Sequence, residues 1–173
     1  MPPKSFLFIR HGQTDWGPAD ITRGPLDLSL NSIGRKQAQN AFDVASKRFD
    51  LVHPKIFSSD LLRAQETAEI FANNISPKPK ITSIPGLNER YYGDYSKLSA
   101  PDDAETSNDF AQRVQTTFRN LFDQMPTDQT TIIISHQKVF EYLTEWLTGN
   151  TSKLEQGGVC YFKYGADGTF KIV

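Results

Sequence analysis

The chain has a single cysteine, Cys160, among its 173 residues, and this excludes an intramolecular disulfide. A chain without disulfides is typical of a reducing compartment. Cys160 lies in the apolar run 159–162. We therefore expect its side chain to be a small buried hydrophobe rather than a reactive thiol.

Long hydrophobic runs are also missing. The N-terminal apolar stretch, residues 6–9, ends at Arg10, which makes it too short for the core of a signal peptide or a membrane span. We therefore expect a cytoplasmic protein without a membrane partner. The formal net charge of −1 gives no basic excess, so no nucleic-acid partner is expected either.

Internal repeats, low-complexity tracts and Gly/Ser linkers are absent from the sequence. A chain of this length suffices for one hydrophobic core and is short for two. The sequence therefore predicts a single domain over residues 1–173.

Short apolar runs alternate with stretches of helical periodicity. Residues 6–9 are apolar at every position, as in a strand buried on both faces, and residues 130–134 are β-branched, as in a central strand. The predicted strands are residues 6–9, 55–57, 81–84 and 130–134, followed by a C-terminal hairpin of 159–164 with 169–173.

Four helices are predicted between these strands. Ser59 is placed as a cap of the second helix, Thr106 and Asp109 resemble a capping box for the third, and Gly149 ends the fourth. Their inward faces are Ala38, Ala41, Phe42, Ala45 and Phe49; Leu61, Ala64, Ala68 and Phe71; Phe110, Val114, Phe118, Leu121 and Phe122; and Val139, Tyr142, Leu143, Trp146 and Leu147.

This alternation predicts an α/β fold, a three-layer sandwich whose mostly parallel central sheet carries helices on both faces and a C-terminal hairpin. Ligands of such sheets bind beyond the carboxyl ends of the strands. Candidate functional residues are therefore sought where the strands end.

Two predicted strands are followed by a histidine. His11 comes after Arg10 at the end of the first strand, and His136 follows Ser135 at the end of the fourth. Neighbouring strands lie about 4.8 Å apart, so the two imidazoles would face each other. Arg63, in the first turn of the helix after the second strand, could reach back over the strand ends. His53 lies in a connecting segment, and no role is expected for it.

Neither a metal nor another cofactor is expected. The chain has three histidines, and they form neither a His-x-His nor a His-Glu-x-x-His pattern. A metal-dependent hydrolase therefore has little support in the sequence.

Five segments in order resemble the histidine phosphatase superfamily, the group that includes cofactor-dependent phosphoglycerate mutases and many small phosphatases. The resemblance extends over nearly the whole chain. It is carried by Arg10–Thr14, Pro25–Leu30 leading to Gly34–Ala38, Ser58–Ala68, Leu87–Gly93, and Glu105–Val114 followed by Ser135–His136.

The resemblance implies a catalytic set of five residues. His11 would be the nucleophile that attacks phosphorus, with its other ring nitrogen held by an acceptor such as a backbone carbonyl. Arg10, Arg63 and His136 would surround the transferring group, helped by free N–H groups at the start of the helix after His136. Glu89 would donate a proton to the leaving oxygen and then act as base for water.

The resemblance further implies a small phosphorylated substrate. The candidate substrate-binding residues are Arg10, Gln13, Thr14, Arg23, Gly24, Arg63, Arg90, Tyr92 and Gln137. Two positions depart from the family pattern: Gly17 stands where many members have asparagine, and Gln137 stands where many have glycine. Gln137 matches the fructose-2,6-bisphosphatase branch, and Gln13, Thr14 or Arg23 could compensate for Gly17.

The segment between the acid and the second histidine leaves the type of reaction open. The lid, residues 93–104, is short and polar, which predicts an open site and favours a phosphatase. Residues 87–93 look more like those of a mutase, and Arg90, Tyr92 and Lys97 could contact a second anionic group. A phosphoglycerate mutase is the alternative enzyme. A catalytically weak phospho-ligand binding module is a third alternative, although it would be expected to have lost His11 or Glu89.

Overall fold

The computed structural model describes residues 4–15, 27–93 and 104–173. Within these ranges one sheet has the strand order β3-β2-β4-β1-β5-β6. Neighbours from β3 to β1 are parallel, whereas β5 and β6 join antiparallel. The strands are β1 Phe6–Arg10, β2 Lys55–Ser58, β3 Ile81–Ser83, β4 Thr131–Ser135, β5 Val159–Tyr164 and β6 Phe170–Ile172. The predicted mostly parallel sheet with a C-terminal hairpin is confirmed.

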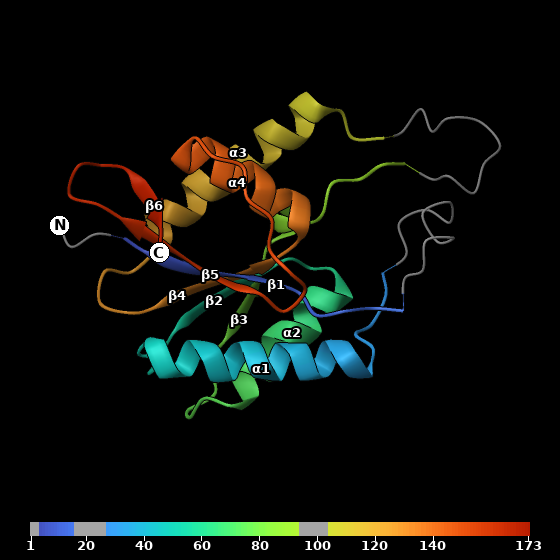
Figure 1. The fold of residues 1–173 in the computed structure, drawn as a ribbon, viewed down its shortest axis with the longest axis vertical. Helices are drawn as coiled ribbons and strands as arrows, with labels where there is room; N and C mark the ends of the chain where they lie inside the picture. Colours follow the sequence, from blue (N-terminus) through green and yellow to red (C-terminus); the bar gives the residue numbers. More distant parts are fainter. Residues whose placement is uncertain (1–3, 16–26, 94–103) are drawn as a thin grey trace.

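Helices cover both faces of this sheet, as predicted (Figure 1). Helices α1 (Ser32–Arg48) and α2 (Leu62–Asn73) lie on one face, and α3 (Ser107–Gln124) and α4 (Gln137–Thr148) lie on the other. A short 3-10 helix, η2 (Pro85–Leu87), follows β3. None of the helices in the described ranges is both long enough and apolar enough to span a bilayer.

The sandwich explains why β1 is apolar at successive positions. Phe6 and Phe8 belong to the core under α3 and α4, whereas Leu7 and Ile9 belong to the core under α1 and α2. Successive side chains of a strand point to opposite faces, so both sets are buried. The central position of β4, between β2 and β1, agrees with its β-branched sequence.

Helix ends follow the predicted signals in two cases. The Thr106 side chain accepts the Asp109 N–H at 3.1 Å at the start of α3, and Gly149, with φ 74°, ends α4. In α1, Asn31 is the N-cap, and Phe49 lies just beyond the helix rather than on its face; its ring packs on Tyr161 at 4.8 Å.

The prediction that Ser59 caps α2 was wrong. The N-cap is Leu61, which makes no side-chain capping bond, and Ser59 precedes it by two residues. The Ser59 N–H donates to the Ile134 carbonyl at 2.9 Å, which keeps this residue attached to the sheet edge. The helix therefore starts later, and the Ser59 hydroxyl is available for other partners.

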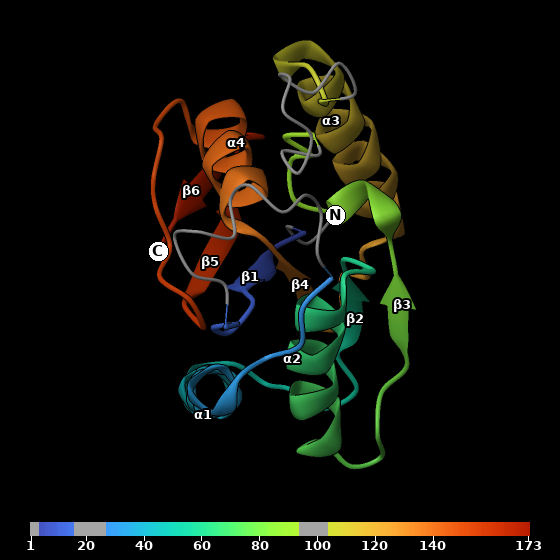
Figure 2. The ribbon, with the colours of Figure 1, turned by 90° about the vertical axis from the view of Figure 1, so that its right-hand side faces the viewer.

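The carboxyl ends of three neighbouring strands meet at one edge of the sheet (Figure 2). Arg10 of β1 pairs with Ser135 of β4, and Ser58 of β2 pairs with Ile134. The residues that come next in each case, His11, Ser59 and His136, are therefore brought to the same edge. This is the position at which the sequence predicts the functional site.

Candidate active site

His11 is held in one tautomer by its own loop. Its Nδ1 lies 2.7 Å from the carbonyl oxygen of Gly12. A carbonyl only accepts hydrogen bonds, so Nδ1 carries the proton and Nε2 keeps its lone pair. The expected backbone acceptor for His11 is thus present, and Nε2 is the ring nitrogen without a proton.

The Gly12 carbonyl is fixed by a close crossing of two backbones. A Cβ on Gly12 would lie 2.2 Å from the Gly34 oxygen, and a Cβ on Gly34 would lie 2.0 Å from the Gln13 oxygen. Only glycine fits at either position. The Gly12 N–H also donates to Thr67 Oγ1 on α2 at 3.3 Å. The loop after β1 is therefore seated between α1 and α2.

Burial and neighbouring cations keep His11 neutral. Its side chain is 7% exposed, and Arg63 Nε donates to its Nε2 at 3.3 Å. Burial, then the charges of Arg63 and Arg10, lower the pKa of His11 to about 3 against the opposing effect of the Gly12 carbonyl. Nε2 is thus unprotonated throughout the physiological pH range, and its lone pair accepts from Arg63.

Arg10 is oriented by Gln137. One terminal nitrogen of Arg10 donates to Gln137 Oε1 at 3.1 Å and to the Leu154 carbonyl at 2.8 Å. Gln137 Nε2 in turn donates to Glu141 Oε1 at 2.9 Å. A glycine at position 137 could not make these bonds, so Gln137 gives Arg10 a support of its own. Among the described residues, the buried Arg10 Nε has no hydrogen-bond acceptor, and it is therefore able to donate to a bound anion.

His136 faces His11, with 4.9 Å between the ring centroids, which confirms the predicted juxtaposition. His136 is wholly buried, and its Nε2 lies 2.8 Å from Ser59 Oγ. Burial, followed by His11, Arg63 and Arg10, lowers the pKa of His136 well below its usual value. Two neutral imidazoles and two arginines thus lie together at this edge of the sheet.

Glu89 is held at the start of α4. Its Oε1 accepts the backbone N–H of Arg90 at 3.0 Å and of Lys138 at 3.1 Å, and its Oε2 lies 3.3 Å from the Lys138 nitrogen. The sequence predicts that free N–H groups at the start of this helix help to hold the phosphoryl group. One of them, the Lys138 N–H, is used by the Glu89 carboxylate instead. Burial raises the pKa of Glu89 against these two hydrogen bonds and the charges of Arg63 and Arg10. Oε2, with the weaker bond, is the oxygen better placed to carry a proton.

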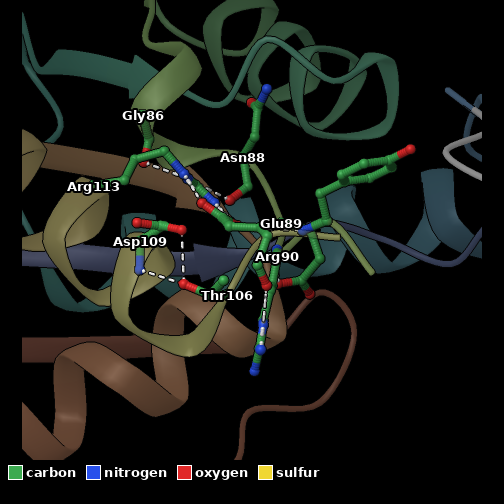
Figure 3. A network of polar contacts seen from close by, with 9 residues as sticks. Gly86, Asn88, Glu89, Arg90, Thr106, Asp109 and Arg113 are labelled. Carbon is green, nitrogen blue, oxygen red and sulfur yellow. Dashed lines mark hydrogen bonds and ion pairs between the residues drawn. The ribbon is translucent and has the colours of Figure 1, made fainter. Parts of the chain in front are cut away.

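Arg113 of α3 fixes the segment that leads to Glu89 (Figure 3). One of its terminal nitrogens donates to the carbonyls of Gly86 and Asn88, at 2.9 and 3.0 Å. The rest of the guanidinium makes a two-pronged ion pair with Glu105, at 2.7 and 2.8 Å. Glu105 also accepts the Tyr91 N–H at 3.3 Å. This ion pair therefore positions the backbone on both sides of Glu89.

Arg90 and Tyr92 lie close to this network. Arg90 donates to the Glu105 carbonyl and to Ser107 Oγ. Its guanidinium lies over the Tyr92 ring, with 5.2 Å between Cζ and the ring centroid. Tyr92 is 42% exposed. Arg90 is therefore already engaged by α3 and the segment before it.

Gln13 and Thr14 lie beside His11 in the loop after β1. Gln13 Oε1 accepts from Asn31 Nδ2 at 3.0 Å, and Thr14 forms an isolated antiparallel β-bridge with Leu30. Four positions singled out from the sequence lie outside the described residues, and so does most of the expected lid: Gly17, Arg23, Gly24, Lys97 and residues 94–103.

Two supporting groups were missed from the sequence, namely the Ser59–Asn88 pair and the Glu105–Arg113 pair. The Ser59–Asn88 bond joins residues 29 apart in the chain, and the Glu105–Arg113 ion pair joins α3 to the segment just before it. Their only signal was membership in the matching segments 58–68, 87–93 and 105–114. Within the described ranges, no three His, Cys, Asp or Glu side chains are grouped so that they could hold a metal ion.

The model of the histidine phosphatase superfamily (branch 1) matches residues 6–160. The chain belongs to this superfamily. The match includes every described residue of the site, from Arg10 to Gln137.

Known relatives and structures of the superfamily agree with this. Phosphoglycerate mutase 1 of Saccharomyces cerevisiae is 34% identical over 72% of this chain and 49% of its own length. The metal-independent phosphoserine phosphatase of Arabidopsis thaliana is 33% identical over 57% of this chain and 40% of its own. The fold matches a mycobacterial glucosyl-3-phosphoglycerate phosphatase with a TM-score of 0.78, at 22% identity over 99% of this chain and 96% of the other. The chain thus spans half or less of the length of these curated relatives.

The lowered pKa of His11 predicts a pH-dependent stability. Below pH 6.5 the unfolded chain binds a proton on this residue, whereas the folded chain does not until about pH 3. The free energy of unfolding should therefore decrease as the pH is lowered from 6.5 to about 3. His11 should contribute up to about 1.4 kcal/mol per pH unit to this decrease. Urea unfolding at pH 6, 5 and 4 should show a shallower fall in His11→Asn. In His53→Asn, at an exposed site, the slope should stay as in the parent. Equal slopes in all three proteins would contradict the shift.

Proposed function

We propose that the chain is a phosphomonoester phosphatase that works through a phosphohistidine on His11, with Glu89 as general acid and base. The observation that carries this proposal is the state of His11: neutral, with its proton held on Nδ1 by the Gly12 carbonyl and its Nε2 lone pair beside Arg63. An imidazole in this state needs no base before it attacks phosphorus.

The first chemical step transfers the phosphoryl group to the enzyme. His11 Nε2 forms a bond to phosphorus while the bond from phosphorus to the leaving oxygen breaks. That oxygen takes the proton from Glu89, whose raised pKa favours the protonated form. The His11 ring then carries a positive charge, and its Nδ1–H remains bonded to the Gly12 carbonyl.

The second step returns the enzyme to its starting state. Water attacks phosphorus and gives a proton to the Glu89 carboxylate, and the P–N bond breaks. In both steps negative charge spreads over three phosphoryl oxygens. Arg10, Arg63 and His136 are the groups that would stabilise it, since preorganised donors supply most of the catalysis in phosphoryl transfer.

A phosphoglycerate mutase is the alternative, because mutases are among the relatives and residues 87–93 resemble theirs. A mutase must shield its phosphohistidine from water, which requires a lid that closes. Residues 94–103 supply ten mostly polar residues for this purpose. We infer that this is too few to exclude water, so hydrolysis should win over transfer back to the substrate.

An assay with 3-phosphoglycerate and 2,3-bisphosphoglycerate distinguishes the two activities. We expect inorganic phosphate to be released faster than 2-phosphoglycerate is formed. Isomerisation that exceeds hydrolysis by about tenfold would favour the mutase.

The reaction should persist in excess chelator, because the charge stabilisation comes from Arg10, Arg63 and His136. Loss of activity in chelator, restored by a divalent ion, would refute metal independence.

A further inference from the structure

The Ser59 hydroxyl has three polar neighbours and only one proton to give. The Asn88 Oδ1 lies 2.7 Å away, the His136 Nε2 lies 2.8 Å away, and the Leu61 nitrogen lies 3.2 Å away. The Leu61 N–H can only donate to the hydroxyl. The Ser59 proton therefore goes either to Asn88 or to His136.

Asn88 settles which of the two receives it. Its Oδ1 also accepts the backbone N–H of Asp60 at 3.2 Å, which identifies this atom as the amide oxygen rather than the amide nitrogen. An amide oxygen can only accept, so the contact of 2.7 Å with Ser59 requires the serine proton. Ser59 then has only lone pairs to offer His136, and Nε2 of His136 must be the protonated nitrogen.

We propose that Ser59 and Asn88 are positioning residues that hold His136 as its Nε2–H tautomer, opposite to the Nδ1–H tautomer of His11. The second ring nitrogen of His136, Nδ1, is buried without a partner among the described residues. In the resting protein this atom carries a lone pair. It can donate to an oxyanion only after it gains a proton.

The surroundings of His136 connect this proton to the anion. The charged and titratable groups that act on the ring are Arg10 at the end of β1, His11 just after it, Arg63 from α2 and Arg113 from α3. The three arginines oppose a positive charge on His136, and His11 would do the same if it were protonated. A bound dianion offsets this repulsion, so its binding should bring one proton from solvent to Nδ1. This second step rests on the proposed function, whereas the resting tautomer does not.

The resting tautomer can be read by NMR of the ¹⁵N-labelled imidazoles in the unliganded protein at pH 8. His136 should show a protonated Nε2 and a bare Nδ1, and His11 the reverse. An unprotonated Nε2 on His136 would overturn the proposal.

Saturation with tungstate, a dianion that carries no proton, should then lead to protonation of Nδ1 of His136. A bare Nδ1 in that complex would overturn the proton uptake.

Variants test whether Ser59 is the cause. In Ser59→Ala the Nε2–H has lost its acceptor, so His136 should become a mixture of tautomers, and kcat/KM should fall about ten- to a hundredfold with a displaced pH profile. Ser59→Thr keeps the hydroxyl and should restore the single tautomer. A pure Nε2–H tautomer in Ser59→Ala would show that the Ser59–Asn88 pair does not determine the tautomer of His136. If the NMR results hold but no phosphate ester is hydrolysed, the proposed function fails alone.

Discussion

Replacing His11 with asparagine should lower kcat/KM for any accepted phosphate ester by roughly four to six orders of magnitude. The Nε2 lone pair is the only group that the proposed route uses to attack phosphorus. Asparagine can still occupy the buried site and donate to the Gly12 carbonyl, but it offers no comparable nucleophile. Phosphate release from p-nitrophenyl phosphate measures the loss.

His53 provides a matched control for this variant. It is exposed and has a φ of 56°, a left-handed conformation that asparagine tolerates well. His53→Asn should therefore keep full activity. Tungstate binding to His11→Asn would verify that the anion site is still formed. A His11→Asn protein that binds tungstate and keeps more than about 1% of the parent activity would exclude His11 as the nucleophile.

Replacing Glu89 with glutamine should affect substrates unequally. For alkyl phosphates such as 3-phosphoglycerate, whose alkoxide leaves poorly, we expect a loss of about a thousandfold, since general acids contribute about 10² to 10⁴. For p-nitrophenyl phosphate, whose leaving group hardly needs a proton, the loss should be less than about tenfold. The amide oxygen of glutamine can still accept the N–H groups of Arg90 and Lys138, so the backbone should stay in place.

A control on the same helix separates charge from chemistry. Glu145 is an exposed carboxylate of α4, away from the contacts that hold Glu89. Glu145→Gln should leave both substrates unaffected. If Glu89→Gln slowed both substrates by the same factor, the residue would act by positioning or by charge, and the proton donor would have to be sought elsewhere.

The fold was predictable because its signals are local. Residues 6–9 and 130–134 are apolar or β-branched at each position, which two-sided burial requires, and strand ends that face one another follow from parallel pairing. The positions of His11 and His136 follow from the same rule. The Thr106 capping box is also local, since it joins residues only three apart.

The support of the site could not be predicted in the same way. Ser59 was expected to cap α2, because a serine before a helix has this role when only its neighbours are considered. Its hydroxyl does accept the nearby Leu61 N–H, but its other two partners, Asn88 and His136, lie 29 and 77 residues away. The bonds from Arg113 to the backbone of Gly86 and Asn88 likewise cross from α3 to another segment. Such contacts depend on the tertiary arrangement and leave no periodic signal in the sequence.

The most direct test of the central claim is to trap the phosphorylated enzyme. A substrate labelled in its phosphoryl group should be mixed rapidly with the protein and quenched in alkali, where phosphohistidine survives. The account predicts one label per chain at most, lost in acid, on the peptide that contains His11 and on its Nε2, and absent from His11→Asn. An acid-stable label on serine, a label on aspartate or on His136, or rapid turnover with no labelled protein would contradict it.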